Sequence, residues 1–389
     1  MMKLFKNAIV FAPQYLGKQD VLVASNKIIA IDHNIELEAS HSLTVIDAKE
    51  QYLIPGLVDS LVHISGGGGE GGFATRTPEM SPQDAVYGGV TTLIGALGTD
   101  SVTRSLEDLV AKAKALKEFG LSAYCYSGSY HYPVKTITAS LEKDILMIDE
   151  IIGVGEVAIS DHRSSQMSVD DLARLTSQAR VGGMLAGKSG IVSIHVGDEP
   201  TELALLEQVC QSSGIPLSQF YPTHINRSQS LLNTGIEFAK KGGFIDFTTS
   251  TTEQILAAGE VAAPLALKMA LDAGVHINHI SMSSDGNGSL PVFDQESHLI
   301  DLQVANVRSL HQAMVTAHQD YQVDLAMAIG SVTKSPANIL GLAHKGRIEV
   351  GADADLLLLE RESLAIDSVF ALGQPMMQAK TLTRKPYFS

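Results

Sequence analysis

The sequence predicts an α/β protein built on a (β/α)8 barrel of the TIM type, with a small β-sandwich domain formed by the two ends of the chain. Through the middle of the chain, short β-prone segments alternate with longer helical patterns, which is the signature of repeated βαβ units and a parallel sheet. Eight such segments occur, the number that a closed barrel needs. An open doubly wound sheet is the alternative, but the glycine-rich dinucleotide fingerprint of that fold is absent from the sequence.

The small domain is predicted from residues 1–54 and 343–389. Near the start of the chain, turn-forming residues such as Pro13, Asn26 and Asn34 separate short β-rich runs. These runs are residues 8–12, 21–24 and 27–31. The corresponding runs at the end of the chain are residues 347–350, 354–359, 368–371 and 379–382. Two β segments that are distant in the sequence can complete one sandwich, so we expect them to pair.

The barrel is predicted from residues 55–342. Its expected strands are residues 57–63, 91–97, 122–127, 156–160, 191–195, 220–224, 244–247 and 280–283. Helical patterns fall between them, for example over residues 201–211. The clearest helix is 106–119, because Ser105 is a favourable N-cap and Gly120 a favourable stop.

Composition and charge argue against several classes of protein. Of the 389 residues, 45% are hydrophobic and 18% charged, which favours a globular chain with a large core over a disordered one. The net charge of −15 argues against a nucleic-acid partner, which needs clustered Lys and Arg. The acidic charge therefore favours a small substrate. No apolar stretch reaches membrane-spanning length. The only two cysteines, Cys125 and Cys210, cannot form a disulfide framework, so we expect a cytoplasmic protein.

Polar residues suited to catalysis follow the predicted strands at the carboxyl end of the barrel, where such enzymes place their active sites. They are His63, Glu156 with Asp161 and Arg163 close behind, His195, His224 with Arg227, and Asp285 followed by Ser289. A single histidine at a strand end is usually a hydrogen-bonded structural residue. Three histidines and two carboxylates on successive strand ends are better explained by a shared metal ion, because unpaired buried polar groups are costly.

Imidazole nitrogen and carboxylate oxygen are ligands that Zn²⁺ accepts. A zinc ion with an open position lowers the pKa of bound water to about 7 and so makes a nucleophile available at neutral pH. Asp285 would take the proton of that water and return it to the leaving amine. These residue types therefore predict metal-dependent hydrolysis of an amide bond.

Several motifs resemble those of the isoaspartyl dipeptidases of the amidohydrolase superfamily. They are HISGGGGE at 63–70, GTD at 98–100, SYH at 129–131, ISDHR at 159–163, IHVGD at 194–198, PTHINR at 222–227, SSDGNGS at 283–289 and GRIEVGADADLLLL at 346–359. The motifs are spread over the whole chain. The resemblance implies a homo-oligomer, either an octamer or another assembly of dimers.

The resemblance also implies roles for single residues. Metal ligands of the family fall on His63, His195, His224 and Asp285, and Asp285 is also the proton shuttle. Substrate-binding positions fall on Gly68, Gly69, Glu70, Thr99, Tyr130, Arg163, Arg227 and Ser289. Glu70 would pair with the free α-amino group, and Tyr130 would hydrogen-bond the carbonyl oxygen as it becomes an oxyanion. Arg163, Arg227 and Ser289 would hold the two carboxylates of the isoaspartyl dipeptide, since arginine matches carboxylate bidentately.

The sequence departs from the family pattern at two places. Leu61 stands where the family has the first of two histidines, and Glu156 stands where it has a carboxylated lysine that bridges two metals. Glutamate is shorter than that lysine, and Gly155 looks like an inserted residue, so we expect a bulge that re-aims Glu156. The complete ligand set is then Glu156, His195 and His224, and we expect one or two Zn²⁺ ions, with one held more tightly.

Two alternatives stay open on the sequence. Another amidohydrolase, such as a cyclic amidase or an N-acyl-amino-acid deacylase, would share the metal chemistry and differ in its substrate loops. A catalytically impaired homologue that only binds its ligand is the non-enzymatic alternative, and Leu61 is the residue that supports it.

Overall fold

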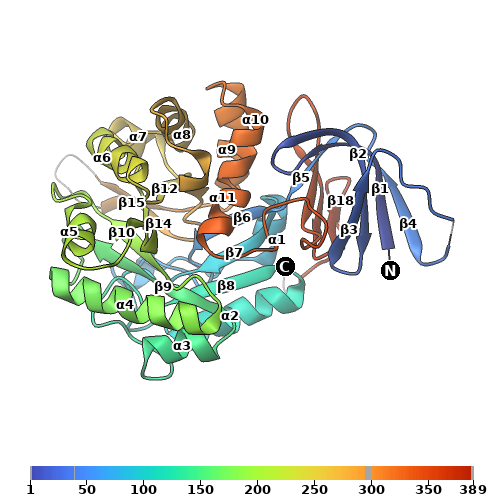
Figure 1. The fold of residues 1–389 in the computed structure, drawn as a ribbon. Coiled ribbons are helices and arrows are strands. Elements are labelled where there is room, and N and C mark those ends of the chain that lie inside the picture. Colours follow the sequence, from blue (N-terminus) through green and yellow to red (C-terminus); the bar gives the residue numbers. More distant parts are fainter. Residues whose placement is uncertain (1, 39, 294–298, 387–389) are drawn as a thin grey trace.

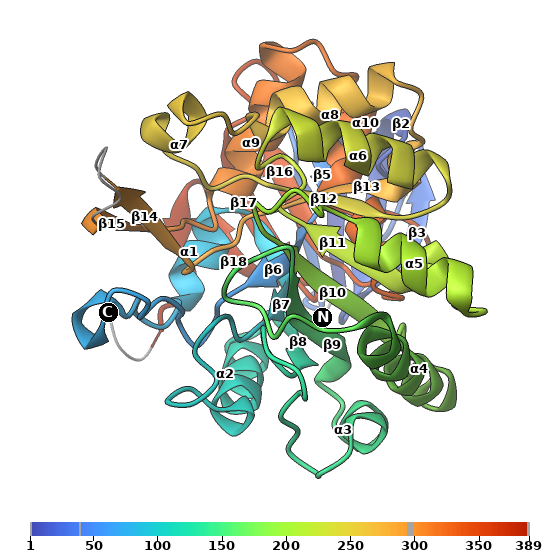
Figure 2. The ribbon, with the colours of Figure 1, turned by 90° about the vertical axis from the view of Figure 1, so that its left-hand side faces the viewer.

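The computed structural model describes residues 2–38, 40–293 and 299–386. A curled sheet of parallel strands lies at its centre, with helices around it (Figure 1, Figure 2). Six strands are hydrogen bonded in the order β11-β10-β9-β8-β7-β6, and β12 pairs with β13. The bounds are β6 Leu57–Val62, β7 Val90–Gly95, β8 Ser122–Ser127, β9 Ile151–Ile159, β10 Ile191–Val196, β11 Phe220–Thr223, β12 Ile245–Thr248 and β13 Ile280–Ser283. All eight predicted strand segments are present, and the predicted fold class is confirmed.

Helices follow the strands and cover the outside of the sheet (Figure 2). They are α1 Pro82–Tyr87, α2 Leu106–Phe119, α3 Leu141–Met147, α4 Val169–Ala186, α5 Ala204–Ser212, α6 Gln229–Lys240, α7 Glu253–Ala257, α8 Ala263–Asp272, α9 Ser309–Gln319, α10 Leu325–Ser331 and α11 Lys334–Ile339, with short 3-10 turns at Phe73–Thr75, Leu217–Gln219 and Ile277–His279. Helix α2 has the predicted ends: the Ser105 side chain accepts from Asp108 N, and Gly120 ends the helix at φ 109°. A hairpin of β14 Ser289–Phe293 and β15 Leu299–Val304 follows β13.

Strands from both ends of the chain form a second sheet, seen at the right of Figure 1. Its order is β19-β18-β17-β16-β5-β1-β2-β3, and β4 pairs with β1. The bounds are β1 Met2–Phe11, β2 Tyr15–Ala24, β3 Lys27–Asp32, β4 Leu43–Asp47, β5 Tyr52–Pro55, β16 Leu356–Leu359, β17 Ile366–Ala371, β18 Gln374–Gln378 and β19 Thr381–Leu382. The rings of Phe5 and Phe370 are 4.9 Å apart although β1 and β17 are not neighbours, so the sheet folds over its own core.

One predicted strand of the small domain is wrong. Residues 347–350 form no strand, because turns at Gly346 (φ 66°) and Gly351 (φ 91°) flank the segment. Ile348 still packs into the core of the sheet, so its apolar character reflects burial and not strand pairing. Residues 1, 39 and 387–389, which we assigned to this domain, lie outside the described residues, and the boundaries at 54 and 343 stay a prediction.

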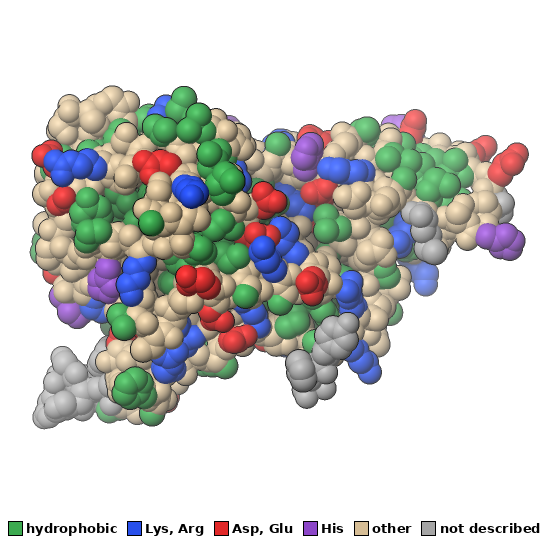
Figure 3. All heavy atoms as spheres, turned by 90° about the horizontal axis from the view of Figure 1, so that it is seen from below, with side chains coloured by type: hydrophobic (Ala, Val, Ile, Leu, Met, Phe, Trp, Pro, Cys, Tyr) green, Lys and Arg blue, Asp and Glu red, His purple; other side chains and the backbone are tan. Residues whose placement is uncertain are grey.

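The outer face carries charges of both signs. On the face drawn in Figure 3, Lys and Arg side chains are interspersed with Asp and Glu side chains and do not gather into one patch. Within the described ranges, none of the helices combines the length and the apolar character needed to cross a membrane.

A buried lysine joins the barrel to the small sheet. Lys345 is only 4% exposed, and its Nζ lies 2.6 Å from Ser122 Oγ at the start of β8. The same nitrogen lies 2.7 Å from Asp355 and 2.9 Å from Asp353, just before β16. Burial alone would lower the pKa of Lys345, but the two carboxylates raise it, so the side chain stays charged.

We expect Lys345→Met to lower the free energy of unfolding by roughly 3 kcal/mol, because it leaves the buried Asp355 carboxylate without its cation. Asp353 keeps its ion pair with Lys27 at 2.8 Å. Urea denaturation followed by circular dichroism measures the loss. The control is Lys268→Met, which breaks an exposed pair with Asp272 in α8 and should cost less than about 0.5 kcal/mol. Equal effects of the two substitutions would contradict the proposed link.

Candidate metal centre and active site

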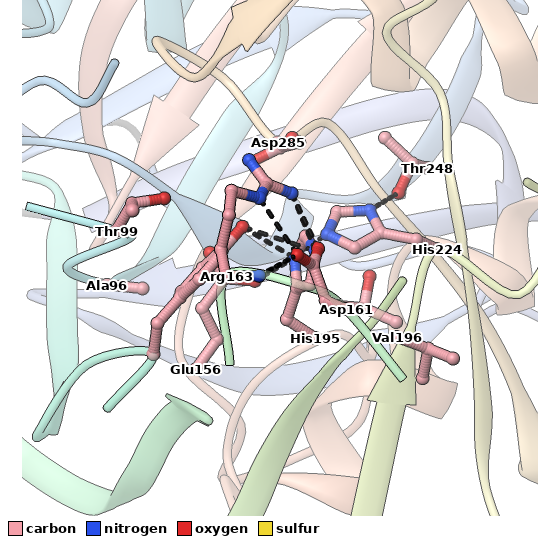
Figure 4. Close-up of polar contacts among 12 residues, drawn as sticks. Ala96, Thr99, Glu156, Asp161, Arg163, His195, Val196, His224, Thr248 and Asp285 are labelled. Atoms are coloured by element: carbon pink, nitrogen blue, oxygen red, sulfur yellow. Dashed lines mark hydrogen bonds and ion pairs between the residues drawn. The ribbon is translucent and has the colours of Figure 1, made fainter. Parts of the chain in front are cut away.

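Three buried side chains converge at the carboxyl ends of β9, β10 and β11. Glu156, His195 and His224 each offer a ligand atom, and these atoms lie within 4.8 Å of one another. Glu156 Oε2 is 3.3 Å from His195 Nδ1 and 3.6 Å from His224 Nε2. The three side chains point toward one another in Figure 4. The expected convergence of these residues from distant parts of the sequence is therefore observed.

A bulge in β9 aims Glu156 into this cluster. Val154 pairs with Val192 and Val157 pairs with Ile194, so Gly155 and Glu156 together stand opposite Ser193. Gly155 adopts φ 148°, and a Cβ there would lie 2.6 Å from Ser193 Cβ. The predicted bulge is confirmed, and only glycine fits it.

His63 and Asp285 complete the cluster on the side of β6 and β13. His63 Nε2 lies 3.1 Å from Asp285 Oδ1 and 3.4 Å from Glu156 Oε1, while its Nδ1 lies 3.2 Å from Ala96 O. Leu61, in contrast, is 2% exposed and packs in an apolar cluster inside the barrel. The position where the family has a further histidine therefore contributes no polar atom.

Burial and neighbouring charges both shift the pKa values of these groups. Burial opposes protonation of His63, but Asp285 and Glu156 outweigh it and raise its pKa to about 10. Burial and the neighbouring His195 lower the pKa of His224 to about 4, so its imidazole is neutral at pH 7, as a metal ligand must be. Burial alone would raise the pKa of Glu156, but the three neighbouring histidines lower it.

The residues present fit a divalent cation. Glu156 Oε1 and Asp285 Oδ1 are buried, and among the described residues neither accepts a hydrogen bond of good geometry, although His63 Nε2 lies 3.4 and 3.1 Å from them. Such atoms are costly unless an ion or a well-placed donor satisfies them. A glutamate and two histidines are also a ligand set found in catalytic zinc sites with three protein ligands. The geometry identifies a candidate metal site and leaves the identity of the metal open.

Asp161 and Arg163 lie in the next layer of side chains (Figure 4), and Tyr130 contacts His195 from the same layer. The Tyr130 hydroxyl is 2.7 Å from His195 Nδ1, and burial raises its pKa well above the usual value, so the phenol keeps its proton. Asp161 accepts from Arg163 Nε at 2.9 Å and from Nη2 at 2.6 Å, and lies 3.1 Å from His195 Nε2. Arg163 is thus paired with Asp161, and its remaining nitrogen, Nη1, lies 3.6 Å from Glu70.

The other predicted substrate-binding residues also lie at this end of the barrel. Thr99 donates to Glu70 Oε1 at 2.8 Å. A Cβ added to Gly68 would lie 3.3 Å from Ser289 Cβ, so the glycine loop lies against the start of β14. Gly69 follows at φ 106°.

Arg227 lies on the β10 side of the cluster. Its Nη1 donates to Val196 O at 2.9 Å and lies 3.4 Å from His195 Nε2, while its Nε is 3.5 Å from Asp198. Arg163, Arg227 and Glu70 therefore lie near the Glu156, His195 and His224 cluster, and their roles in binding a doubly acidic substrate stay a prediction.

One contact to the cluster has no counterpart in the sequence-based prediction. Thr248, the last residue of β12, lies 2.6 Å from His224 Nδ1 and fixes the direction in which His224 Nε2 points. The run of polar residues at 248–252, directly after an expected strand, was the signal that could have identified it.

Comparison with known proteins places the chain in a family. A model of the Amidohydrolase family matches residues 52–383, and the chain belongs to that family. It is 40% identical to the beta-aspartyl dipeptidase of the thermophilic keratin-degrading Fervidobacterium islandicum AW-1, whose crystal structure was determined in complex with beta-Asp-Leu dipeptide. That match has a TM-score of 0.92 and covers 100% of both chains, so the two proteins are homologues and the resemblance predicted from the motifs is confirmed.

Other proteins match the chain at lower identity. A dihydroorotase of Pediococcus pentosaceus is 24% identical in an alignment of 403 positions, which covers 93% of this chain and 90% of that protein. A D-hydantoinase structure has a TM-score of 0.69 at 14% identity and covers 100% of this chain and 98% of its own.

We expect Gly155→Ala to lower the free energy of unfolding by about 2 kcal/mol, since the added methyl group meets Ser193 and the backbone conformation disfavours alanine. Urea denaturation measures the effect. Gly214→Ala is the matched control, because no atom lies within 4 Å of its added Cβ, and it should change the free energy by less than about 1 kcal/mol. If both substitutions were equally mild, the bulge would tolerate a side chain and its requirement for glycine would be refuted.

Proposed function

We propose that this protein is a metal-dependent dipeptidase that hydrolyses the β-aspartyl bond of isoaspartyl dipeptides. The observation that carries the proposal is the charge pattern around the Glu156, His195 and His224 cluster, in a homologue of a beta-aspartyl dipeptidase. Such a dipeptide has two carboxylates and one ammonium group. Arg163 and Arg227 would bind the carboxylates together with Ser289, and Glu70, hydrogen bonded by Thr99, would bind the ammonium group.

We propose that Glu156, His195 and His224 hold Zn²⁺, with His63 and Asp285 beside them. When bound, the metal supplies a Lewis acid that polarises the scissile carbonyl and lowers the pKa of water. Asp285 accepts the proton of the attacking water and delivers it to the amine nitrogen as the C–N bond breaks. Tyr130 donates a hydrogen bond to the carbonyl oxygen while negative charge develops there. The products are aspartate and a free amino acid.

Leu61 and Glu156 underlie our proposal that one metal is held more tightly than a second. The buried side of the cluster keeps only His63, Asp285 and one oxygen of Glu156.

We further propose a cytoplasmic homo-oligomer, as an octamer or another assembly of dimers, which light scattering of the purified protein would test.

A cyclic amidase is the second candidate function, because the dihydroorotase match extends over most of the chain. The two candidates differ in substrate charge: hydantoins and dihydroorotate carry no free α-ammonium group for Glu70. Comparing hydrolysis of β-Asp-Leu with that of a hydantoin and of dihydroorotate separates them.

We expect purified protein to contain close to one tightly bound zinc per chain and to hydrolyse β-Asp-Leu. Chelation should abolish the activity, and added Zn²⁺ should restore it, because the nucleophile depends on the metal. Elemental analysis and amino-acid release measure both quantities. Two tightly held ions would contradict the one-metal proposal, and fully metallated protein that leaves β-Asp-Leu intact would contradict the dipeptidase proposal.

We expect Tyr130→Phe to lower kcat for β-Asp-Leu by about 100-fold, as loss of one oxyanion donor does in other hydrolases, with a small change in KM. Steady-state kinetics measures the two parameters. Tyr87→Phe, at a partly exposed position in α1, is the control and should leave both unchanged. A higher KM with an unchanged kcat would instead mean that Tyr130 binds the substrate and the transition state equally strongly.

A further inference from the structure

A second buried carboxylate lies inside the barrel and has no part in the chemistry above. Asp246 of β12 is 1% exposed, and five hydroxyl groups of three other strands surround it. These donors are Ser60 of β6, Tyr221 and Thr223 of β11, and Ser281 and Ser283 of β13. A buried charge held by hydroxyl groups alone costs stability, so its position calls for an explanation.

The two oxygens of Asp246 have different partners. Oδ2 accepts from Thr223 Oγ1 at 2.8 Å and from Ser283 Oγ at 2.5 Å. Thr223 directly precedes His224, and Ser283 lies two residues before Asp285. Oδ1 accepts from Ser281 Oγ at 2.5 Å, and the hydroxyls of Ser60 and Tyr221 are 3.5 Å from it. One oxygen therefore joins the chain segments that carry His224 and Asp285.

His224 and Asp285 both need such support. Their φ angles are 64° and 52°, in the left-handed region that residues other than glycine avoid unless surrounding contacts hold them there. On the Asp285 side, Asp59 adds a second contact, accepting from Ser284 N at 3.0 Å and from Ser284 Oγ. On the His224 side, Thr248 contacts the ring, and it lies two residues after Asp246, on the same face of β12.

The backbone joins these segments only in part, because Ile225 N donates to Asp246 O at 3.2 Å and β12 pairs with β13. Strands β12 and β13 form a pair of their own, separate from the six-stranded sheet that ends at β11 and β6. β11 and β12 share no continuous ladder, so side chains that span β12 add to the backbone link in setting the spacing between the end of β11 and the end of β13. The Asp246 carboxylate lies on that strand and bonds to both neighbours.

We propose that Asp246 is a positioning residue, which holds His224 and Asp285 at the separation that metal binding requires and thereby sets the affinity for zinc. The inference rests on the metal site of the proposed function. It assigns no contact between Asp246 and the metal or the substrate, because Asp246 acts through Thr223 and Ser283.

The test compares hydroxyl groups on the two oxygens of the same carboxylate. Thr223→Val and Ser283→Ala each remove a donor to Oδ2. Ser281→Ala, the control, removes a donor to Oδ1 together with the 2.5 Å contact between Ser281 Oγ and the Tyr221 hydroxyl, so it disturbs the buried network at least as much. Ser281 is also fully buried, but Met282 follows it and is no candidate ligand. We expect the Kd for zinc, measured by competition with a chromophoric chelator, to rise about tenfold in the Oδ2 variants and less than twofold in the control.

Excess zinc gives a second readout. Because the Oδ2 variants keep every ligand, kcat for β-Asp-Leu should recover at saturating zinc, and thermal denaturation should show all three variants to be folded. Asp246→Asn, which removes the charge, should weaken zinc binding at least as much as either Oδ2 variant. Equal zinc affinity in the Oδ2 variants and the control, whether all weakened or all unchanged, would overturn the positioning role. Failure of the wild-type protein to bind zinc would instead contradict the proposed function itself.

Discussion

The candidate site depends on one buried carboxylate that three imidazoles share. Glu156 lies within 3.3–3.6 Å of His63, His195 and His224, and its negative charge is what makes a pocket of histidines attractive to a cation. The bulge at Gly155 brings the carboxylate there. Without that bulge the strand periodicity would point the side chain elsewhere, because successive residues of a strand face opposite sides. A local irregularity of β9 is therefore a condition for the metal site.

Around this centre, charge is arranged in layers. The inner layer contains Glu156 and Asp285 and is a candidate site for a cation, while Arg163 and Arg227 next to it are cationic and Glu70 beyond Arg163 is anionic. Asp161 stabilises this order, since it accepts hydrogen bonds from Arg163 and lies against His195. The same pairing lowers the pKa of Asp161 and raises that of Arg163, so both stay charged. A substrate with two carboxylates and an ammonium group complements this arrangement.

Much of the fold and most of the candidate site could be predicted from the sequence. The eight barrel strands were visible because buried parallel strands are continuous apolar runs, and His63, His195 and His224 were visible because each ends or follows such a run. The strand expected at 347–350 was wrong, since Ile348 is buried by a turn flanked by glycines. Thr248 and Asp246 were missed because hydroxyls and lone acids in a strand resemble ordinary structural residues.

The sequence by itself determined which chemical groups arrive at the carboxyl end of the barrel, because strand ends and side-chain alternation are local properties. It also determined that position 61 offers no ligand. Only the tertiary structure decided which of these groups meet: that Arg163 pairs with Asp161, that Thr248 orients His224, and that Asp246 joins β11 to β13. Those contacts depend on strand register and on how the barrel closes, and both result from packing among residues far apart in the chain.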